Sequence, residues 1–227
     1  RRAKFIYINY PNNPTGAVAT KAFYEKLVAW AKTYEVGVVS DLAYGALGYR
    51  GYENPSFLST PGAKDVGVEF YTFSKTFNMA GWRLAFAAGN DQMIEALNLI
   101  QDHLFVGIFP ALQEAGIAAL LDPKSEEAVA QLNATYDSRR DAFVQAAAKI
   151  GWKAFPSKGS FYAWMPVPEG YTSESFADLL LEKAHVAVAP GKGFGPAGDA
   201  YVRIGLLVEP ERLVEAVDRI ANLQLFN

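Results

Sequence analysis

Four short segments carry side chains that could do covalent chemistry, and they occur in a fixed order along the chain. The segment SKTFNMAGWR places Lys75 at the end of an apolar aromatic run, with Arg83 eight residues later. A lysine forms a Schiff base with an aldehyde only as the neutral amine, which burial beside apolar groups and a second cation both favour. Phe73 and Phe77 would supply the apolar surroundings, and Arg83 the second cation. The other three segments contribute an amide, a carboxylate, a phenol and another guanidinium: Asn13 in NNPTG, Asp41 and Tyr44 in DLAY, and Arg203 in YVRIG.

Three predicted strands position the first three of these segments. Apolar runs predict strands at Phe5–Tyr10, Val36–Ser40 and Phe70–Phe73. The second run, VGVVS, is typical of a strand buried on both faces. The helical spacing after Thr20 predicts a helix between the first two strands, with Thr20 as its N-cap. Strands that alternate with helices predict a mostly parallel sheet, and ligands bind outside the carboxyl ends of such strands. We therefore expect Asn13, Asp41 and Lys75 to converge at one edge of a sheet.

The remainder of the chain predicts helices and then a second region of strands. Helical patterns begin at Asp91 and Pro110, and a long helix is predicted at Ser125–Ile150. After Gly151 the strand-like segments WKAFPSKGSFYAWMPV, VAVAPG and AYVRIGLL are separated by one predicted helix, and another helix follows them. We expect residues 1–105 to form one domain and residues 106–227 a second, smaller one.

Each candidate residue also has a structural explanation when it is taken alone. Asp41 could close an Asx turn at a strand end, and Tyr44 could be ordinary packing. Arg83 and Arg203 could each pair with an acidic side chain. In the last strand, alternation places Arg203 on the face opposite its apolar neighbours, where a guanidinium must be solvated, paired or available to an anion. The order and spacing of the whole set favour a site over a coincidence.

Composition excludes several other classes of function. The formal net charge is −3, from 21 basic and 24 acidic side chains without a basic run, so the sequence lacks the electrostatic pattern of nucleic-acid or anionic-membrane binding. Cysteine is absent, which excludes disulfides, thiolate nucleophiles and zinc–thiolate sites and suits a reducing cytoplasm. No metal site is predicted, and no apolar run approaches membrane-spanning length.

The motifs NPTG, DLAY, SKTFNMAGWR and the late Arg203 together resemble those of the class I/II aminotransferases of fold type I, which use pyridoxal 5′-phosphate. The resemblance covers essentially the whole chain. It implies an α/β fold, with part of a mostly parallel large-domain sheet, its flanking helices and a smaller α+β C-terminal domain. Chains of this family are longer, so the resemblance implies that an N-terminal arm and the first half of the large domain are missing. That half normally supplies the phosphate cup and the aromatic that stacks on the cofactor ring.

The resemblance also implies a role for each residue that matches a family motif. Lys75 would form the aldimine with the cofactor and then move the proton between substrate and cofactor. Asp41 would pair with the pyridine nitrogen, while Asn13 and Tyr44 would hydrogen-bond the phenolic oxygen. Lys75, Asp41 and Tyr44 would thus be the catalytic residues.

The remaining matches concern anionic groups. Arg83 would bind the cofactor phosphate, and Thr72 occupies the place of a phosphate-binding hydroxyl. Arg203, together with Asn13, would bind the substrate, because the planar guanidinium fork suits its α-carboxylate.

The expected activity is amino transfer from an L-amino acid to a 2-oxo acid by a homodimer, with substrates of the methionine, kynurenine, aromatic or diaminopimelate type. A carbon–sulfur lyase on the same fold remains an alternative, because it uses the same lysine chemistry. A second alternative is a ligand-sensing domain of a bacterial transcriptional regulator, whose DNA-binding part would precede this chain. We expect this span alone to be inactive.

Overall fold

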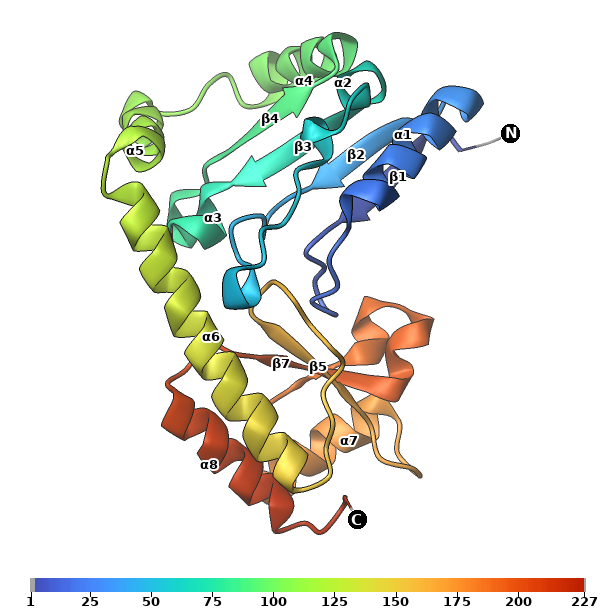
Figure 1. Cartoon of the computed structure of the whole chain (residues 1–227), viewed down its shortest axis with the longest axis vertical. Coiled ribbons are helices and arrows are strands. Elements are labelled where there is room, and N and C mark those ends of the chain that lie inside the picture. The colour runs from blue at the N-terminus through green and yellow to red at the C-terminus, as the bar shows by residue number, and fades with distance from the viewer. Residues whose placement is uncertain (1–2, 227) are drawn as a thin grey trace. The chain divides into compact units, whose positions relative to one another are not determined.

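A computed structural model describes residues 3–226 of the chain. It divides into two compact units, one formed by the residues up to Pro11 with Val18–Leu132, and the other by Asn12–Ala17 with the residues from Asn133 onward (Figure 1). The division falls at Leu132, within a helix, whereas the sequence-based boundary lies at residue 105. The assignment of residues 1–105 and 106–227 to two domains stays a prediction.

The first unit is built on a four-stranded mixed sheet. Its order is β1-β2-β3-β4, with three parallel strands and β4 antiparallel to β3. β4 can run antiparallel because only two short helical turns connect it to β3, whereas a parallel strand would need a long crossover. This sheet and its helices confirm the predicted α/β class. The strands are β1 (Phe5–Asn9), β2 (Gly37–Asp41), β3 (Gly67–Thr72) and β4 (Ala85–Gly89).

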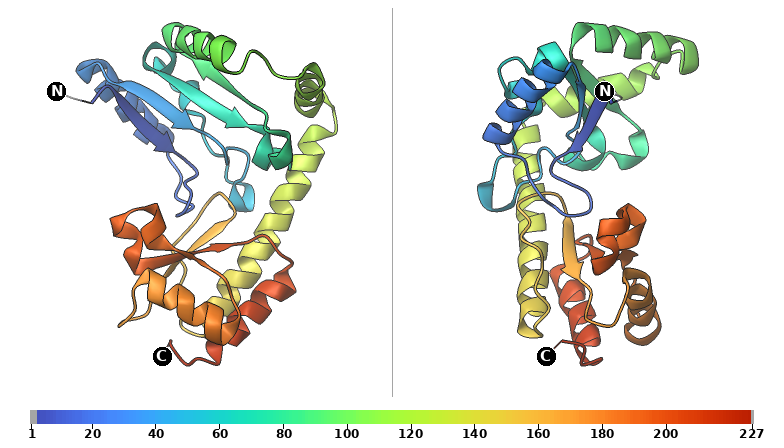
Figure 2. Two further views of the ribbon diagram at one scale, coloured as in Figure 1. Left: turned by 180° about the vertical axis from the view of Figure 1, so that it is seen from behind. Right: turned by 90° about the vertical axis from the view of Figure 1, so that its right-hand side faces the viewer.

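Helix α1 (Lys21–Tyr34) covers one face of this sheet (Figure 2). Thr20 caps it as predicted, accepting a hydrogen bond from the Phe23 amide at 3.1 Å. Its apolar stripe packs into a cluster with Ile8 and Val38 of the sheet. Tyr24, Leu27, Val28 and Ala31 form that stripe.

The opposite face is more open. Helix α4 (Asp91–Leu104) lies there, beside an apolar pocket of about 410 Å³ lined by residues of β1, β2, β3 and α4. Phe5 and Tyr7 of β1 remain 60% and 67% exposed. The prediction that VGVVS is buried on both faces is therefore wrong for the described chain: Val38 is buried, while Val39 on the open face is only partly covered.

A buried carboxylate holds the long connection between β2 and β3. Glu69 of β3 accepts hydrogen bonds from the hydroxyls of Ser40 and Ser56 and, at 2.8 Å, from the amide of Phe57. A buried charge needs this many donors, because burial without partners is costly. The connection contains two 3₁₀ turns, η1 (Tyr49–Gly51) and η2 (Phe57–Ser59), and the short helix α2 (Ala63–Val66).

Beyond β3 the chain forms α3 (Phe73–Thr76), the 3₁₀ turn η3 (Ala80–Trp82) and, after β4 and α4, α5 (Pro110–Leu121). The side chains of Phe73, Met79 and Leu84 form a small buried cluster, against which residues of α5 pack. The predicted long helix follows as α6 (Ser125–Lys149), with Glu126 and Glu127 in its first turn.

The second unit contains a three-stranded antiparallel sheet of order β5-β7-β6, which fits the expected α+β architecture. One face is apolar and buried, with Met165 and Val202 fully covered. Helix α8 packs Leu213, Val217 and Ile220 inward. The elements are β5 (Tyr162–Pro166), α7 (Ser173–Leu179) with the π-helical turn η4 (Leu180–Ala184), β6 (Ala189–Pro190), η5 (Gly191–Phe194), η6 (Pro196–Ala200), β7 (Tyr201–Gly205) and α8 (Pro210–Ala221).

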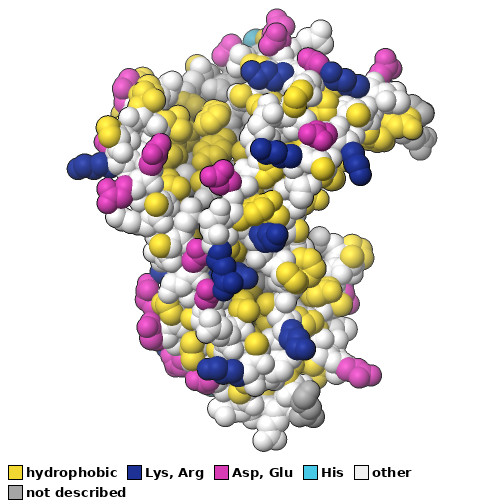
Figure 3. Space-filling view, viewed as in Figure 1, with side chains coloured by type: hydrophobic (Ala, Val, Ile, Leu, Met, Phe, Trp, Pro, Cys, Tyr) yellow, Lys and Arg dark blue, Asp and Glu magenta, His cyan; other side chains and the backbone are white. Residues whose placement is uncertain are grey.

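The surface agrees with the charge balance of the sequence. Lys and Arg side chains are spread over the face drawn in Figure 3 instead of forming one block. None of the helices in residues 3–226 has the combination of length and hydrophobicity that crossing a membrane requires.

Candidate active site

Parallel pairing in the first unit brings the carboxyl ends of β1, β2 and β3 to one edge. Asn9 pairs with Asp41 in register, and its side-chain amide donates to the Asp41 carbonyl at 3.0 Å. β3, which pairs with β2, ends at Thr72. Asp41 therefore lies at the edge of the sheet predicted for it, and Thr72 lies at the same edge, at the end of the neighbouring strand.

Asp41 closes an Asx turn beyond β2. One oxygen of its carboxylate, Oδ1, accepts from the Ala43 amide at 3.1 Å. The following Tyr44 is buried, and its carbonyl accepts from the Leu47 amide at 2.9 Å. Asp41 thus closes an Asx turn and Tyr44 is packed in the interior, as their structural explanations predict. The Asx turn fixes the Asp41 carboxylate at the end of the strand.

A second phenol, which was not predicted from the sequence, lies beside Asp41. Tyr7 pairs with Val39 in register, which places it on the same face of the sheet as Asp41. Partial burial raises the pKa of the Tyr7 phenol, and the negative charge of Asp41 and a hydrogen bond to it raise that pKa further. Strand alternation combined with the parallel register could have found this neighbour.

Lys75 lies in the helical turn α3, immediately beyond β3. The predicted strand Phe70–Phe73 ends one residue too late, because Thr72 ends the strand as the N-cap of α3. Its hydroxyl accepts from the Ser74 amide at 3.2 Å and donates to the Ser74 hydroxyl at 2.9 Å. The Tyr71 and Thr76 hydroxyls are hydrogen-bonded at 2.6 Å, which ties the end of the turn back to β3.

The two phenylalanines expected to surround Lys75 contact each other, and the expectation that they lie against its amine stays a prediction. Phe73 is buried, and its ring lies 5.7 Å from the ring of Phe77. Arg83 follows η3 in a left-handed conformation, and its Nη1 donates to the Ala80 carbonyl at 3.0 Å. Its side chain is exposed, and no acidic side chain within the described residues pairs with it.

Asn13 and Arg203 meet in the second unit. Arg203 Nη1 donates to Asn13 Oδ1 at 2.7 Å. The preceding Asn12 closes the turn, accepting from the Thr15 amide at 3.2 Å and hydroxyl at 2.8 Å. Gly16 is required there, because its φ is +69° and a Cβ would lie 2.1 Å from the Ser157 hydroxyl. The turn formed by NNPTG thus presents the side-chain oxygen of Asn13 to the guanidinium.

Arg203 has no acidic partner in the part of the chain that the structure describes. It lies in the central strand β7, between the buried Val202 and Ile204, as the alternation predicts. Its Nε is buried and has no hydrogen-bond partner. Two aromatic rings that the sequence analysis misses face the guanidinium, those of Tyr162 at 4.3 Å and Phe194 at 4.7 Å. Their contact with Arg203 depends on the register of the strands and on the geometry of the loop that carries Phe194.

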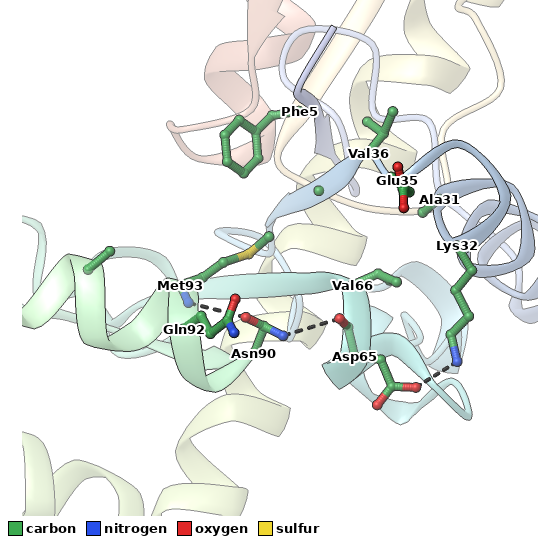
Figure 4. Close-up of a pocket in the computed structure, with 12 residues that line it drawn as sticks. Phe5, Ala31, Lys32, Glu35, Val36, Asp65, Val66, Asn90, Gln92 and Met93 are labelled. Carbon is green, nitrogen blue, oxygen red and sulfur yellow. Dashed lines mark hydrogen bonds and ion pairs between the residues drawn. The ribbon is translucent and has the colours of Figure 1, made fainter.

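The pocket drawn in Figure 4 is a separate feature. It measures about 550 Å³ and lies at the amino ends of the strands, at the opposite edge from Asp41. Asn90 Nδ2 donates to the Asp65 carbonyl at 3.1 Å, and Lys32 forms an exposed ion pair with Asp65. These contacts join the start of α4 to α2, so the pocket belongs to the packing between helices.

The fold and the residues at the sheet edge define an α/β protein with a lysine beyond one parallel strand and a carboxylate at the end of the next. Residues 1–220 match the family model described as aminotransferase class I and II. The chain belongs to this family.

Similar proteins agree with this assignment. The chain is 58% identical to the L-glutamine–4-(methylsulfanyl)-2-oxobutanoate aminotransferase of Bacillus subtilis over 99% of its own length and 56% of that protein. It is 49% identical to the LL-diaminopimelate aminotransferase of Moorella thermoacetica, over 97% of its length and 56% of that protein. The substrate-bound BacF structure from Bacillus subtilis superposes with a TM-score of 0.94 at 48% identity, covering 99% of this chain and 57% of that one. The chain thus spans somewhat more than half the length of these relatives.

Proposed function

We propose that the protein containing this chain is a pyridoxal-phosphate-dependent aminotransferase that moves an amino group from an L-amino acid to a 2-oxo acid. The observation that carries the proposal is the placement of Lys75 in a capped turn directly beyond β3, while the neighbouring β2 ends in Asp41. An amine and a carboxylate are thereby held at the carboxyl ends of adjacent strands of one sheet.

The residues of the first unit suit pyridoxal phosphate by their chemistry. Asp41 offers a carboxylate for a protonated ring nitrogen, and Tyr44 a phenol for the ring oxygen. Lys75 offers the amine that an aldehyde requires. Thr72 supplies a hydroxyl and Arg83 a guanidinium without an acidic partner among the described residues, and both groups suit a phosphate. We assign these five residues to the cofactor, together with Asn13.

When bound, pyridoxal phosphate supplies an electron sink that makes the α-proton of an amino acid removable. The protein's own residues then do the rest. The carboxylate of Asp41 would hold the ring nitrogen in its protonated form. Lys75 Nζ takes the proton from the substrate Cα and acts as a general acid and base. The cap of α3 keeps that amine in place, since proximity and orientation contribute much of the rate.

Arg203 binds the substrate α-carboxylate. A guanidinium without an acidic partner in the described chain, next to the Asn13 amide, is available to an anion. Both the amino acid and the 2-oxo acid carry that carboxylate, so one arginine serves both half-reactions.

The relatives suggest which substrates to test first. The name of the Bacillus subtilis relative states L-glutamine as donor and 4-(methylsulfanyl)-2-oxobutanoate as acceptor, and that of the Moorella relative states LL-diaminopimelate. We propose the first pair for this protein, because identity to that relative is the higher of the two. Full-length enzyme should be assayed against a panel of donors with this acceptor, 2-oxoglutarate, pyruvate and glyoxylate. Preference for an unrelated pair would contradict this assignment.

Half-reaction spectra separate transamination from carbon–sulfur elimination. With an amino acid alone, a transaminase converts its cofactor to the pyridoxamine form and releases one equivalent of 2-oxo acid. Release of ammonia with 2-oxo acid would indicate a lyase instead, and binding without turnover would indicate a sensing domain. No observation in the described residues favours either alternative.

We further propose that the full-length enzyme is a cytoplasmic homodimer. A closed two-fold pair is the commonest oligomer of soluble proteins, and the lack of cysteine suits a reducing compartment. Light scattering on full-length protein should give twice the chain mass, and a fully active monomer would contradict the dimer.

A further inference from the structure

On the sheet face that carries Arg203, aromatic side chains surround its guanidinium. Trp164 of β5 pairs with Arg203 in register, and Tyr201 stacks on Trp164 with ring centroids 5.2 Å apart. Tyr162 lies two residues before Trp164, on the same face. Phe194 of η5 meets Trp164 edge-on at 6.1 Å. The guanidinium is thus surrounded by ring surfaces, with Asn13 as its one polar partner among the described residues.

Two of these rings lie directly against the charge. The Arg203 Cζ lies 4.3 Å from the centre of the Tyr162 ring and 4.7 Å from that of Phe194. Both distances are within the range of about 6 Å for a favourable cation–π contact. They also account for the buried Nε without an oxygen partner, because an aromatic face is a weak acceptor for an N–H group.

The loop that carries Phe194 is firmly held. Gly191 and Gly198 approach so closely that a Cβ on either would lie 2.1 Å from the carbonyl oxygen of the other. The fully buried Ser173 accepts from the Lys192 amide at 3.2 Å and donates to Asp199 at 2.8 Å. A ring on such a loop can hold a neighbouring side chain in one orientation, which a mobile loop could not.

We propose that Tyr162 and Phe194 are positioning residues, which fix the plane of the Arg203 guanidinium so that its free edge meets a substrate carboxylate in one orientation. This inference rests on the proposed carboxylate-binding role of Arg203. A guanidinium recognises a carboxylate through two parallel bonds only when the two planes coincide. Rings that stack on the guanidinium restrict its rotation and leave its edges available. Loss of a ring therefore weakens binding of every substrate that carries the carboxylate.

Exposure separates this role from ordinary core packing. Phe194 is 41% exposed, so its removal opens little of the core. Phe155, in the same unit, is 43% exposed, and its ring is not among those that face Arg203 in the described residues. It provides a matched control of equal size and exposure.

The experiment uses full-length enzyme and steady-state kinetics for both substrates. Phe194→Leu and Tyr162→Leu keep an apolar side chain but remove the ring, and each should raise KM for the amino acid and for the 2-oxo acid by about five- to tenfold. We expect kcat to change by less than about twofold and cofactor absorption to stay at its wild-type position, because Lys75 and Asp41 are untouched. Phe194→Tyr and Tyr162→Phe keep the ring and should restore KM. Phe155→Leu should behave as wild type.

Arg203→Lys distinguishes failure of this inference from failure of the proposed function. If Arg203→Lys raises KM while Phe194→Leu leaves it unchanged, the rings do not position the arginine and the inference is wrong. If Arg203→Lys itself leaves both KM values unchanged, Arg203 does not bind the substrate. Its proposed role and this inference are then both wrong. Should Tyr162→Leu fail to fold, the KM values of Phe194→Leu alone test the inference, because the Phe194 side chain is exposed.

Discussion

The two units hold their candidate groups by different means. In the first unit, Asp41 and Lys75 lie at a strand end and in a turn that local hydrogen bonds fix: an Asx turn to Ala43 and the Thr72 cap of α3. In the second, Arg203 is held chiefly by rings, with one hydrogen bond to Asn13. A hydrogen-bonded cap fixes the backbone of a group that must react. Stacked rings fix the plane of a group that must only bind.

The cores beneath the two sets of residues differ as well. β7 has Val202 fully buried beneath Arg203, whereas β1, beside Asp41, leaves Tyr7 67% exposed in the described chain. On this account, the residues of the first unit govern the rate of the chemical step, and those of the second govern affinity for the carboxylate. The following predictions test that division, from the largest effect to the smallest.

Replacing Lys75 should have the largest effect, and it should act on rate. In full-length enzyme, Lys75→Ala removes both the attachment point of the cofactor and the general base, so kcat should fall by at least about a thousandfold. Single-turnover spectroscopy with the amino acid donor measures this directly. Lys149→Ala, which removes an exposed lysine of α6, should retain wild-type kcat. Substantial turnover by Lys75→Ala would mean that another residue is the general base.

Replacing Arg203 should act mainly on affinity. Arg203→Lys keeps the charge but loses the planar fork and its contact with the two rings, so KM for donor and acceptor should rise by about ten- to a hundredfold. The visible spectrum of the resting enzyme should not change, because the cofactor residues of the first unit are intact. Steady-state kinetics on both substrates check the first expectation, and an absorption scan checks the second. A wild-type KM for both substrates would make Arg203 a structural residue.

The packing of the second unit can be tested independently of activity. Phe176 is fully buried and meets Trp152 edge-on at 5.9 Å. Phe176→Ala should lower the free energy of unfolding of this unit by about 3–5 kcal/mol, through lost burial and the cavity left behind. Denaturant titration measures the loss. The exposed Phe155→Ala should cost less than about 0.5 kcal/mol, and equal losses for the two would contradict the assigned core.

The smallest effect concerns the anchor of the Phe194 loop. Hydrogen bonds from the Ser173 hydroxyl and amide lower the pKa of Asp199, with a smaller contribution from the charge of Lys192. Because the folded-state pKa lies below the unfolded value, this stabilisation is present above the unfolded pKa and is lost as the pH falls through the folded value. Carboxyl NMR titration should show a higher Asp199 pKa in Ser173→Ala than in wild type. An unchanged pKa would mean that Ser173 does not anchor the loop.

The sequence predicts the local elements of the fold well where a single chemical signal dominates. Thr20 marks the start of α1, and the alternation around Arg203 gives its face correctly. The strand before Lys75 is predicted to end one residue too late, because the capping role of Thr72 competes with the strand propensity of the aromatic run. Tyr162 and Phe194 escape prediction altogether. Their contact with Arg203 depends on strand register and on a loop closed by two glycines, and neither leaves a periodic pattern in the sequence.

The central claim, that Lys75 is the residue that carries the cofactor, can be measured on the full-length enzyme as isolated with pyridoxal phosphate. Borohydride reduction fixes the cofactor to the amine that holds it, and peptide mapping by mass spectrometry then identifies that amine. We predict a single phosphopyridoxyl label on Lys75, in the peptide that contains SKTFNMAGWR. A label on another lysine, or none on cofactor-loaded enzyme, would contradict the account.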